Sequence, residues 1–233
     1  MVSFDHLKAI TFDCYGTLID WEAGLLRSLR DVGFDRTISD DALLEAFAAA
    51  EAAAESPARG YIPYKDVLRE VLAGLLLRFG VAPSSLDPYA LANSIPEWPA
   101  FVDTQPALTA LKTRFQLVVV SNIDRDLFSC SLPKLGVMLD GLVTAEDVRS
   151  YKPAPAHFRR ALEVLGLPAS SVLHVAQSLC HDVKPAKALG FTTVWVNRRA
   201  GKTGAGATAP AEAAPDLVAP DLRTLVEMIG SAE

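Results

Sequence analysis

Cysteine is scarce in this chain, and the few that occur form no recognisable pattern. Cys14, Cys130 and Cys180 are an odd number, lie far apart and include no C-x-x-C pair. A disulfide framework and a structural zinc site both need paired or closely spaced cysteines, so the sequence argues against both. We expect these thiols to be packing residues or neighbours of a site.

Long apolar runs and runs of basic residues are also missing. No apolar stretch approaches the roughly 20 residues that span a bilayer, and the start of the chain lacks the regions of a signal peptide. The 22 Lys and Arg residues are outnumbered by 28 Asp and Glu residues, which leaves little to neutralise nucleic-acid phosphates. These absences predict a cytoplasmic protein with neither a membrane nor a nucleic acid as its partner.

Apolar segments with strand character alternate with helical patterns. Among the 233 residues, 50% are hydrophobic and 21% are charged, which is a globular composition with enough apolar residues for a core. Apolar residues have helical spacing in residues 106–114 and 156–165. The pattern ends with a short strand, followed by a helix over residues 221–229. The apolar segments are residues 8–12, 117–120, 172–176 and 192–196. Because they are mostly apolar rather than alternating, as in strands covered on both faces, they predict a doubly wound, parallel, Rossmann-like α/β sheet.

Two stretches interrupt this alternation. Residues 22–100 carry helical patterns only, so we expect a helical cap inserted after the first strand, with residues 1–21 and 101–233 forming the core. The cap is either extra core or a lid over the strand ends, where open α/β sheets bind ligands, and its place in the chain favours the lid. Residues 200–216 are rich in Gly, Ala and Pro without a pattern, which predicts a mobile surface loop.

Polar side chains follow the carboxyl ends of several predicted strands. Asp13 ends the first strand, and Ser121-Asn122, Lys152 and Asp182 follow later ones. Asp13 or Ser121 alone would be read as a helix cap, and Lys152 as a solvated lysine. Together they predict a site where Lys152 keeps Asp13 ionised, because a cation within ~4–6 Å lowers the pKa of a carboxyl.

Four segments that include these polar residues form a series of motifs along the chain. They are Phe12-Asp13-Cys14-Tyr15-Gly16-Thr17-Leu18, Val120-Ser121-Asn122, Tyr151-Lys152-Pro153 and residues 174–189. Together they resemble the haloacid dehalogenase superfamily over essentially the whole chain. The resemblance implies a covalent aspartyl intermediate on Asp13, with Lys152 and Asp182 as its catalytic partners. It places Tyr15, Thr17, Ser121, Asn122 and Ser178 at a small anionic substrate.

Two positions bear on the branch of that superfamily. Tyr15 and Gln177 stand where magnesium-dependent phosphatases have aspartates, and Mg²⁺ needs hard, mostly anionic oxygen ligands. Asp-x-Tyr-Gly-Thr instead resembles the type II 2-haloacid dehalogenases, which implies a small 2-halo or otherwise 2-substituted carboxylic acid and no metal cofactor. The alternatives are a Mg²⁺-dependent phosphatase and a binding module with little turnover. A homodimer is left open.

The match to the dehalogenase branch has gaps. The cap stretch expected to supply a halide-binding arginine has none, which leaves Arg59 as the nearest candidate, and Phe158 replaces an expected tyrosine. The segment from Val175 to Asp182 is one residue longer than in that branch. His181 beside Asp182 suggests a dyad, yet neighbours on a helix rarely face each other, so a structural or rim role is favoured.

The sequence gives weaker predictions for three other residues near the site. His174 is expected to be a hydrogen-bonded core histidine. Tyr64 and Trp98 either line the pocket or pack, and the sequence does not decide between these roles.

Overall fold

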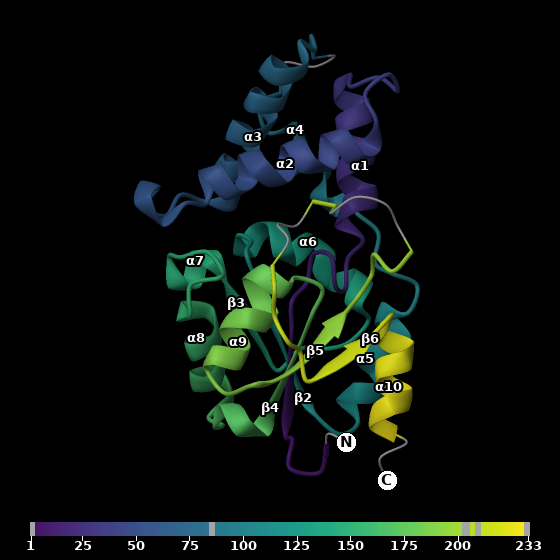
Figure 1. Ribbon diagram of the computed structural model, residues 1–233, viewed down its shortest axis with the longest axis vertical. Helices are drawn as coiled ribbons and strands as arrows, with labels where there is room; N and C mark the ends of the chain where they lie inside the picture. Colours follow the sequence, from purple (N-terminus) through teal and green to yellow (C-terminus); the bar gives the residue numbers. More distant parts are fainter. Residues whose placement is uncertain (1–2, 84–86, 202–205, 208–210, 231–233) are drawn as a thin grey trace.

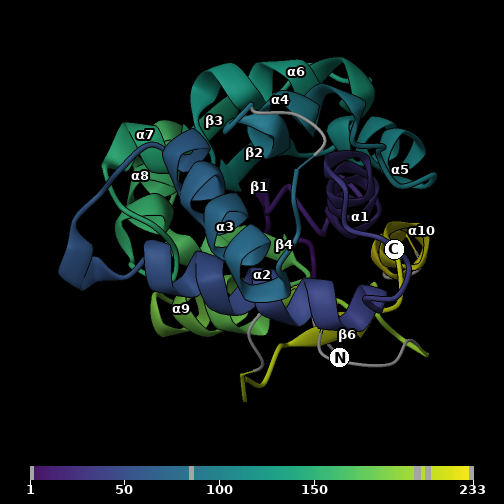
Figure 2. The same cartoon turned by 90° about the horizontal axis from the view of Figure 1, so that it is seen from above.

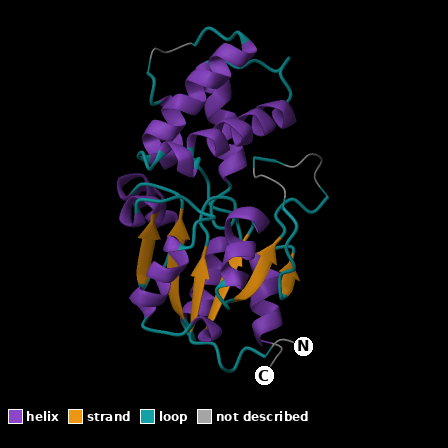
Figure 3. Ribbon diagram, turned by 60° about the vertical axis from the view of Figure 1, so that its left-hand side comes forward, coloured by secondary structure: helices purple, strands orange, loops and turns teal. Residues whose placement is uncertain are grey.

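The computed structural model describes residues 3–83, 87–201, 206–207 and 211–230. Its centre is a six-stranded sheet in the order β3-β2-β1-β4-β5-β6, and every neighbouring pair is parallel. All strands therefore point their carboxyl ends toward one edge (Figure 3). The strands are β1 (Ala9–Phe12), β2 (Gln116–Ser121), β3 (Gly141–Thr144), β4 (Val172–Ala176), β5 (Thr192–Val196) and β6 (Leu217–Ala219).

Helices cover both faces of the sheet, which confirms the predicted doubly wound α/β fold (Figures 1 and 2). One face carries α5 (Thr104–Lys112), α6 (Arg125–Leu135) and α10 (Leu222–Gly230), and the other carries α7 (Ala145–Val148), α8 (Ala156–Leu165) and α9 (Lys184–Ala188). The side chains of β1 alternate between these layers, since Ala9 clusters with Phe158 of α8 while Ile10 clusters with Leu108 of α5. Burial on both faces explains why apolar residues dominate these strands without a regular alternation with polar ones.

Four more helices lie beyond the carboxyl ends of the strands, between β1 and α5 in sequence. They are α1 (Trp21–Val32), α2 (Asp40–Ala54), α3 (Tyr64–Phe79) and α4 (Ala90–Ser94). Figure 1 shows them as a separate layer above the sheet, and Figure 2 shows α2 and α3 crossing over it. Ser39 caps α2, and Gly80 ends α3 in the left-handed conformation that glycine adopts without strain.

The two segments that join these helices to the sheet run side by side. The Asp20 amide donates to the Pro99 carbonyl at 2.8 Å, and the Phe101 amide donates to the Leu18 carbonyl at 3.0 Å. Ile19 and Ala100 form an antiparallel bridge between them. We call residues 18–20 and 99–101 the neck, because the chain leaves and re-enters the sheet layer there.

The structure differs from the sequence predictions at one edge strand and within residues 200–216. The edge strand β3 was not predicted, because it is only four residues long and half of it is incompletely buried. Within residues 200–216, positions 202–205 and 208–210 lie outside the described residues, and Ala207 is buried rather than part of a loose surface loop. No helix in the described part of the chain is long and apolar enough to cross a bilayer.

Candidate active site

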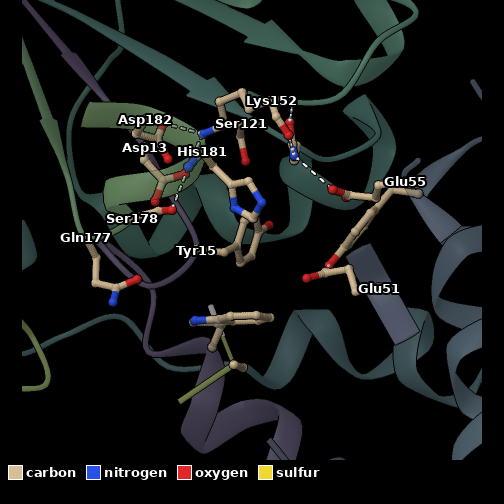
Figure 4. Close-up of a pocket in the computed structure, with 14 residues that line it drawn as sticks. Asp13, Tyr15, Glu51, Glu55, Ser121, Lys152, Gln177, Ser178, His181 and Asp182 are labelled. Atoms are coloured by element: carbon tan, nitrogen blue, oxygen red, sulfur yellow. Dashed lines mark hydrogen bonds and ion pairs between the residues drawn. The ribbon is translucent and has the colours of Figure 1, made fainter. Parts of the chain in front are cut away.

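A cavity of about 60 Å³ lies between the carboxyl edge of the sheet and the helices above it. Its size fits a small molecule or a few waters. Asp13, Lys152 and Asp182 face it from the sheet side, and Glu51 and Glu55 of α2 face them from the opposite side (Figure 4). The lining residues are Asp13, Tyr15, Trp21, Glu51, Glu55, Tyr64, Ser121, Asn122, Lys152, Gln177, Ser178, His181, Asp182 and Ala207.

Asp13 is held where β1 ends and the chain turns. Its amide donates to the Val175 carbonyl of β4 at 3.1 Å, which continues the sheet to this residue. Gly16 then adopts a φ of 99°, which a side chain would disfavour, and lets the chain turn back toward Leu18. The Thr17 hydroxyl donates to Asp13 Oδ2 at 2.7 Å and accepts from the Gln177 amide at 2.9 Å. Thr17 thus lies behind Asp13 and is not among the lining residues.

Lys152 joins the two carboxylates predicted for the site. Its Nζ donates to Asp13 Oδ1 at 2.9 Å, to Asp182 Oδ1 at 2.7 Å and to the Val120 carbonyl at 3.0 Å. The Lys152 side chain is only 2% exposed, so the ion pairs are little screened by water. These three donated bonds use all three ammonium hydrogens, which fixes the cation beside Asp13.

Burial and charge act in opposite directions on the titration of this group. Burial raises the pKa of Asp13 above its ordinary value, and Lys152 only partly reverses the rise. Lys152 therefore lowers this pKa, as predicted, but loss of hydration outweighs the ion pair and the net shift is upward. Burial would lower the pKa of Lys152, but Asp13 and Asp182 raise it above the usual range. Burial would also raise the pKa of Asp182, yet Lys152 and His174 lower it.

Asp182 reaches Lys152 from one turn of π-helix, Leu179–Val183. A π-turn accommodates one extra residue in a helix, which explains how the longer segment from Val175 keeps Asp182 at the site. His174 Nε2 lies 3.2 Å from the same Asp182 oxygen, and its Nδ1 lies 2.9 Å from the Thr11 hydroxyl. The buried His174 is therefore hydrogen-bonded, as predicted, and it also positions Asp182.

Ser121, Asn122 and Ser178 line the cavity as the sequence predicted. Ser121 is the last residue of β2. The Asn122 amide nitrogen lies 3.3 Å from Glu55 Oε2 and 3.3 Å from the Lys152 carbonyl, so this side chain bridges α2 and the core. The Ser178 hydroxyl accepts from the His181 amide at 2.9 Å and caps the π-turn. Ser178 is thus partly occupied by a structural contact.

The donor set around Asp13 does not fit a magnesium ion. The Lys152 ammonium lies between Asp13 and Asp182, the two carboxylates that a cation would need. Tyr15 is hydrogen-bonded to the Ser131 hydroxyl at 2.9 Å, and burial raises its phenol pKa well above the usual value. Among the described residues, no group of three or more His, Cys, Asp or Glu side chains is arranged to hold a metal ion.

Sequence reasoning missed the acidic side of the cavity. Glu51 and Glu55 lie one turn apart on α2, and the Tyr64 hydroxyl of α3 donates to Glu51 Oε1 at 2.6 Å. Glu51 follows the buried Leu44 and Phe47 at helical spacing, so it is a charged residue on the apolar face of its helix. That position was the available sequence signal.

Some of the remaining candidate residues line the cavity and others lie away from it. Arg59 is not among the lining residues, and it pairs with Glu70 at 2.8 Å. Trp98 is buried against Gly24, where a Cβ would lie 2.3 Å from its ring, so it packs. Tyr64 lines the cavity, and so does His181, while Phe158 belongs to the core around α8.

Comparisons with known proteins agree with this architecture. A family model of haloacid dehalogenase-like hydrolases matches residues 7–190. The (S)-2-haloacid dehalogenase 4A of Burkholderia cepacia is 27% identical over 201 residues, which cover 84% of this chain and 85% of the relative. The crystal structure of an L-2-haloacid dehalogenase matches with a TM-score of 0.79 and 26% identity, over 97% of this chain and 99% of the other.

A further solved structure shows the same fold. The L-2-haloacid dehalogenase of Xanthobacter autotrophicus with chloropropionic acid covalently bound matches with a TM-score of 0.80 and 23% identity, over 96% of this chain and 98% of the other. A parallel Rossmann-like sheet with buried ionisable groups at its carboxyl edge, found in a chain with these relatives, defines a hydrolase. The chain belongs to the haloacid dehalogenase-like hydrolases, in likeness to the 2-haloacid dehalogenase branch.

Proposed function

We propose that this protein hydrolyses a small 2-substituted carboxylic acid, in the first place a 2-haloacid, through a covalent ester on Asp13 and without a metal ion. The observation that carries the proposal is the buried ion pair between Asp13 and Lys152 beside the cavity. The names of the relatives support the choice of substrate, and the bound adduct of the Xanthobacter autotrophicus enzyme supports a covalent route.

In the first step, a carboxylate oxygen of Asp13 attacks C2 of the substrate. The new bond is the ester C–O bond, and the carbon–halogen bond breaks as halide leaves with its electron pair. Halide needs no proton to leave, so Tyr15 is not required as an acid. Lys152 and the Thr17 hydroxyl fix the direction of the Asp13 carboxylate, which is a weak nucleophile unless it is ionised and aimed.

In the second step, water adds to the carboxyl carbon of Asp13. His181 is our candidate to take one water proton and to return it to the ester oxygen as the bond from the carboxyl carbon to that oxygen breaks. The 2-hydroxy acid then leaves, the second water proton is released to solvent, and the Asp13 carboxylate is restored. His181 lines the cavity, and burial lowers its pKa, which favours the neutral imidazole that a base needs. Asp182, with its lowered pKa, instead remains the anionic partner of Lys152.

The helical segment 22–100 acts in this proposal as a cap domain over residues 1–21 and 101–233. Its contribution to the cavity is Glu51, Glu55 and Tyr64. Because the cavity is walled by both parts, closing the cap would exclude bulk water from the ester.

The test is turnover of 2-chloropropionate by the wild type and by Asp13→Asn, with and without a chelator. An amide cannot form the ester and is nearly isosteric with the acid, so the variant should fold normally and release no halide. Mass spectrometry of the wild type mixed briefly with substrate should show the ester on the peptide that holds Asp13.

Two outcomes contradict the proposal. Halide release by Asp13→Asn, after deamidation has been excluded by mass spectrometry, would remove the nucleophile. Loss of wild-type activity in chelator, with full recovery on adding Mg²⁺ and turnover of phosphomonoesters, would favour the phosphatase alternative.

A further inference from the structure

The wall of the cavity opposite Asp13 is acidic. Glu51 and Glu55 extend from α2 toward the core residues of the site (Figure 4). Glu51 is only 8% exposed, although its carboxyl borders the cavity. A buried carboxyl group and a partly buried one, four residues apart, are costly to ionise unless something compensates their charge.

The protein supplies no cation dedicated to this wall. Lys152 is the only Lys or Arg among the lining residues, and its three hydrogens are used by Asp13, Asp182 and a carbonyl. No ion pair within the described residues includes Glu51 or Glu55. The lining residues include four carboxyl groups and one ammonium group. An anionic ligand would need the opposite balance of charge.

The hydrogen bonds around the two glutamates are donated to their side-chain oxygens by neighbouring protein groups. The Tyr64 hydroxyl donates to Glu51 Oε1 at 2.6 Å, within the range of a charge-assisted O–H to carboxylate bond. The Asn122 amide nitrogen donates to Glu55 Oε2 at 3.3 Å. Each protein group therefore presents a hydrogen to a glutamate oxygen.

We propose that Glu51 and Glu55 bind an ammonium group of the substrate. The carboxylate of that substrate rests on the proposed function. With both groups, the substrate would be a small zwitterion, that is, a 2-substituted carboxylic acid that also carries an amine. Burial raises the pKa of Glu51 to about 7 and that of Glu55 well above its usual value, and a ligand cation beside them would favour their ionised forms and supply the ion pair that the protein does not. The other titratable groups near the pair are Tyr64, Tyr151 and Lys152.

Binding of two unreactive, nearly isosteric probes tests the wall without any turnover. 3-Aminopropanoate carries an ammonium where butanoate carries a methyl group, and NMR titration gives the Kd of each. We expect wild type to bind 3-aminopropanoate about tenfold or more tightly than butanoate, which is the size of one or two charge-assisted hydrogen bonds. Glu51→Gln and Glu55→Gln should each reduce that ratio, and the double variant should abolish it.

Glu45→Gln is the matched control, because it removes the same charge from an exposed position on α2. It should leave the binding ratio unchanged. Equal affinity for the two probes, tighter binding of butanoate, or a ratio that survives in the double variant would overturn the proposal. Tighter butanoate binding that weakens with rising pH would show that the glutamates act as protonated donors to an anion.

Turnover of the matching reactive pair separates this proposal from the proposed function. The pair is 3-amino-2-chloropropanoate and 2-chlorobutanoate, and we expect the ammonium compound to have the larger kcat/KM. If both compounds react equally, the acidic wall does not select the substrate, although the Asp13 chemistry stands. If neither reacts while 3-aminopropanoate still binds preferentially, the ammonium site stands and the dehalogenase chemistry fails.

Discussion

The Lys152 ammonium compensates the charge of two buried carboxylates, those of Asp13 and Asp182. Its loss should therefore affect both the stability of the fold and the titration of Asp13. In Lys152→Met, Asp13 and Asp182 would share a buried site without a cation. Removing one partner of a buried ion pair destabilises a protein by about 3–5 kcal/mol. The pKa of Asp13 should rise further, because Lys152 is the largest influence that lowers it.

The measurement is the pH dependence of kcat/KM for 2-chloropropionate, alongside chemical denaturation. In the variant, activity should fall by a large factor, and its rise with pH should move to higher pH than in wild type. Lys187→Met, which removes a partly exposed ion pair with Asp216, is the control for loss of a lysine. An acid limb at the same pH in Lys152→Met would contradict the ion-pair role.

Glu51 predicts a pH dependence of stability whose sign can be worked out. Burial raises its pKa from 4.5 to about 7, so the folded state holds a proton that the unfolded state has released. The resulting stabilisation is fully present below the lower value and is lost as the pH rises through the higher one. Glu51→Gln does not titrate, so relative to wild type it should gain about 2–3 kcal/mol between about pH 5 and about pH 8.

Urea denaturation of both proteins across that pH range gives the difference in unfolding free energy. Glu45→Gln on the exposed side of the same helix serves as the comparison. The idea fails if the difference between Glu51→Gln and wild type stays constant, or if wild type gains with rising pH.

At the scale of elements, the first turn of α3 depends on a residue of the sheet layer. The two carboxylate oxygens of Asp124 accept from the Tyr64 and Lys65 amides, each at 2.9 Å, and the Tyr61 hydroxyl adds a contact at 3.3 Å. Asp124 therefore performs across the layers what an N-cap residue does locally. Asp124 thus joins the loop after β2, which carries Ser121, to the helix that carries Tyr64.

Asp124→Ala should lower the unfolding free energy by about 1–2 kcal/mol, as loss of an N-cap does. It should also raise KM more than it lowers kcat, because Tyr64 and α2 would be placed less firmly over the cavity. Asp126→Ala removes an exposed ion pair with Lys65 and an exposed contact with the Leu127 amide, and it is expected to change little. Equal effects of the two substitutions would show that the cap contact is unimportant.

Elements differ in how well the sequence foretold them, for physical reasons. β1, β2, β4 and β5 were predictable because burial on both faces gives short, mostly apolar runs without alternation. β3 was not, because an edge strand of four residues has too few buried positions to give a pattern. The π-turn was also invisible, since a single extra residue in a motif does not reveal whether the helix widens or shifts register.

At the scale of the whole molecule, the sheet side of the site followed from the sequence and the cap side did not. Parallel strands bring their carboxyl ends to one edge, so Asp13, Ser121, Lys152 and Asp182 could be placed together without knowing the strand order. Glu51 faces them only because α2 crosses over the sheet. Packing between layers sets that crossing, and helical spacing alone gives no information about which residue lies opposite.

The neck bears on how the substrate preference of such an enzyme can change during evolution. Because the two crossing segments are hydrogen-bonded to each other, everything between Asp20 and Pro99 begins and ends at nearly one point. A chimera that carries this interval from the Burkholderia cepacia relative should therefore keep the Asp13 chemistry and acquire the donor's preference between 2-chlorobutanoate and its ammonium analogue. Recombination at two adjacent sites would then exchange substrate preference as a unit, while the reaction is inherited separately with the sheet.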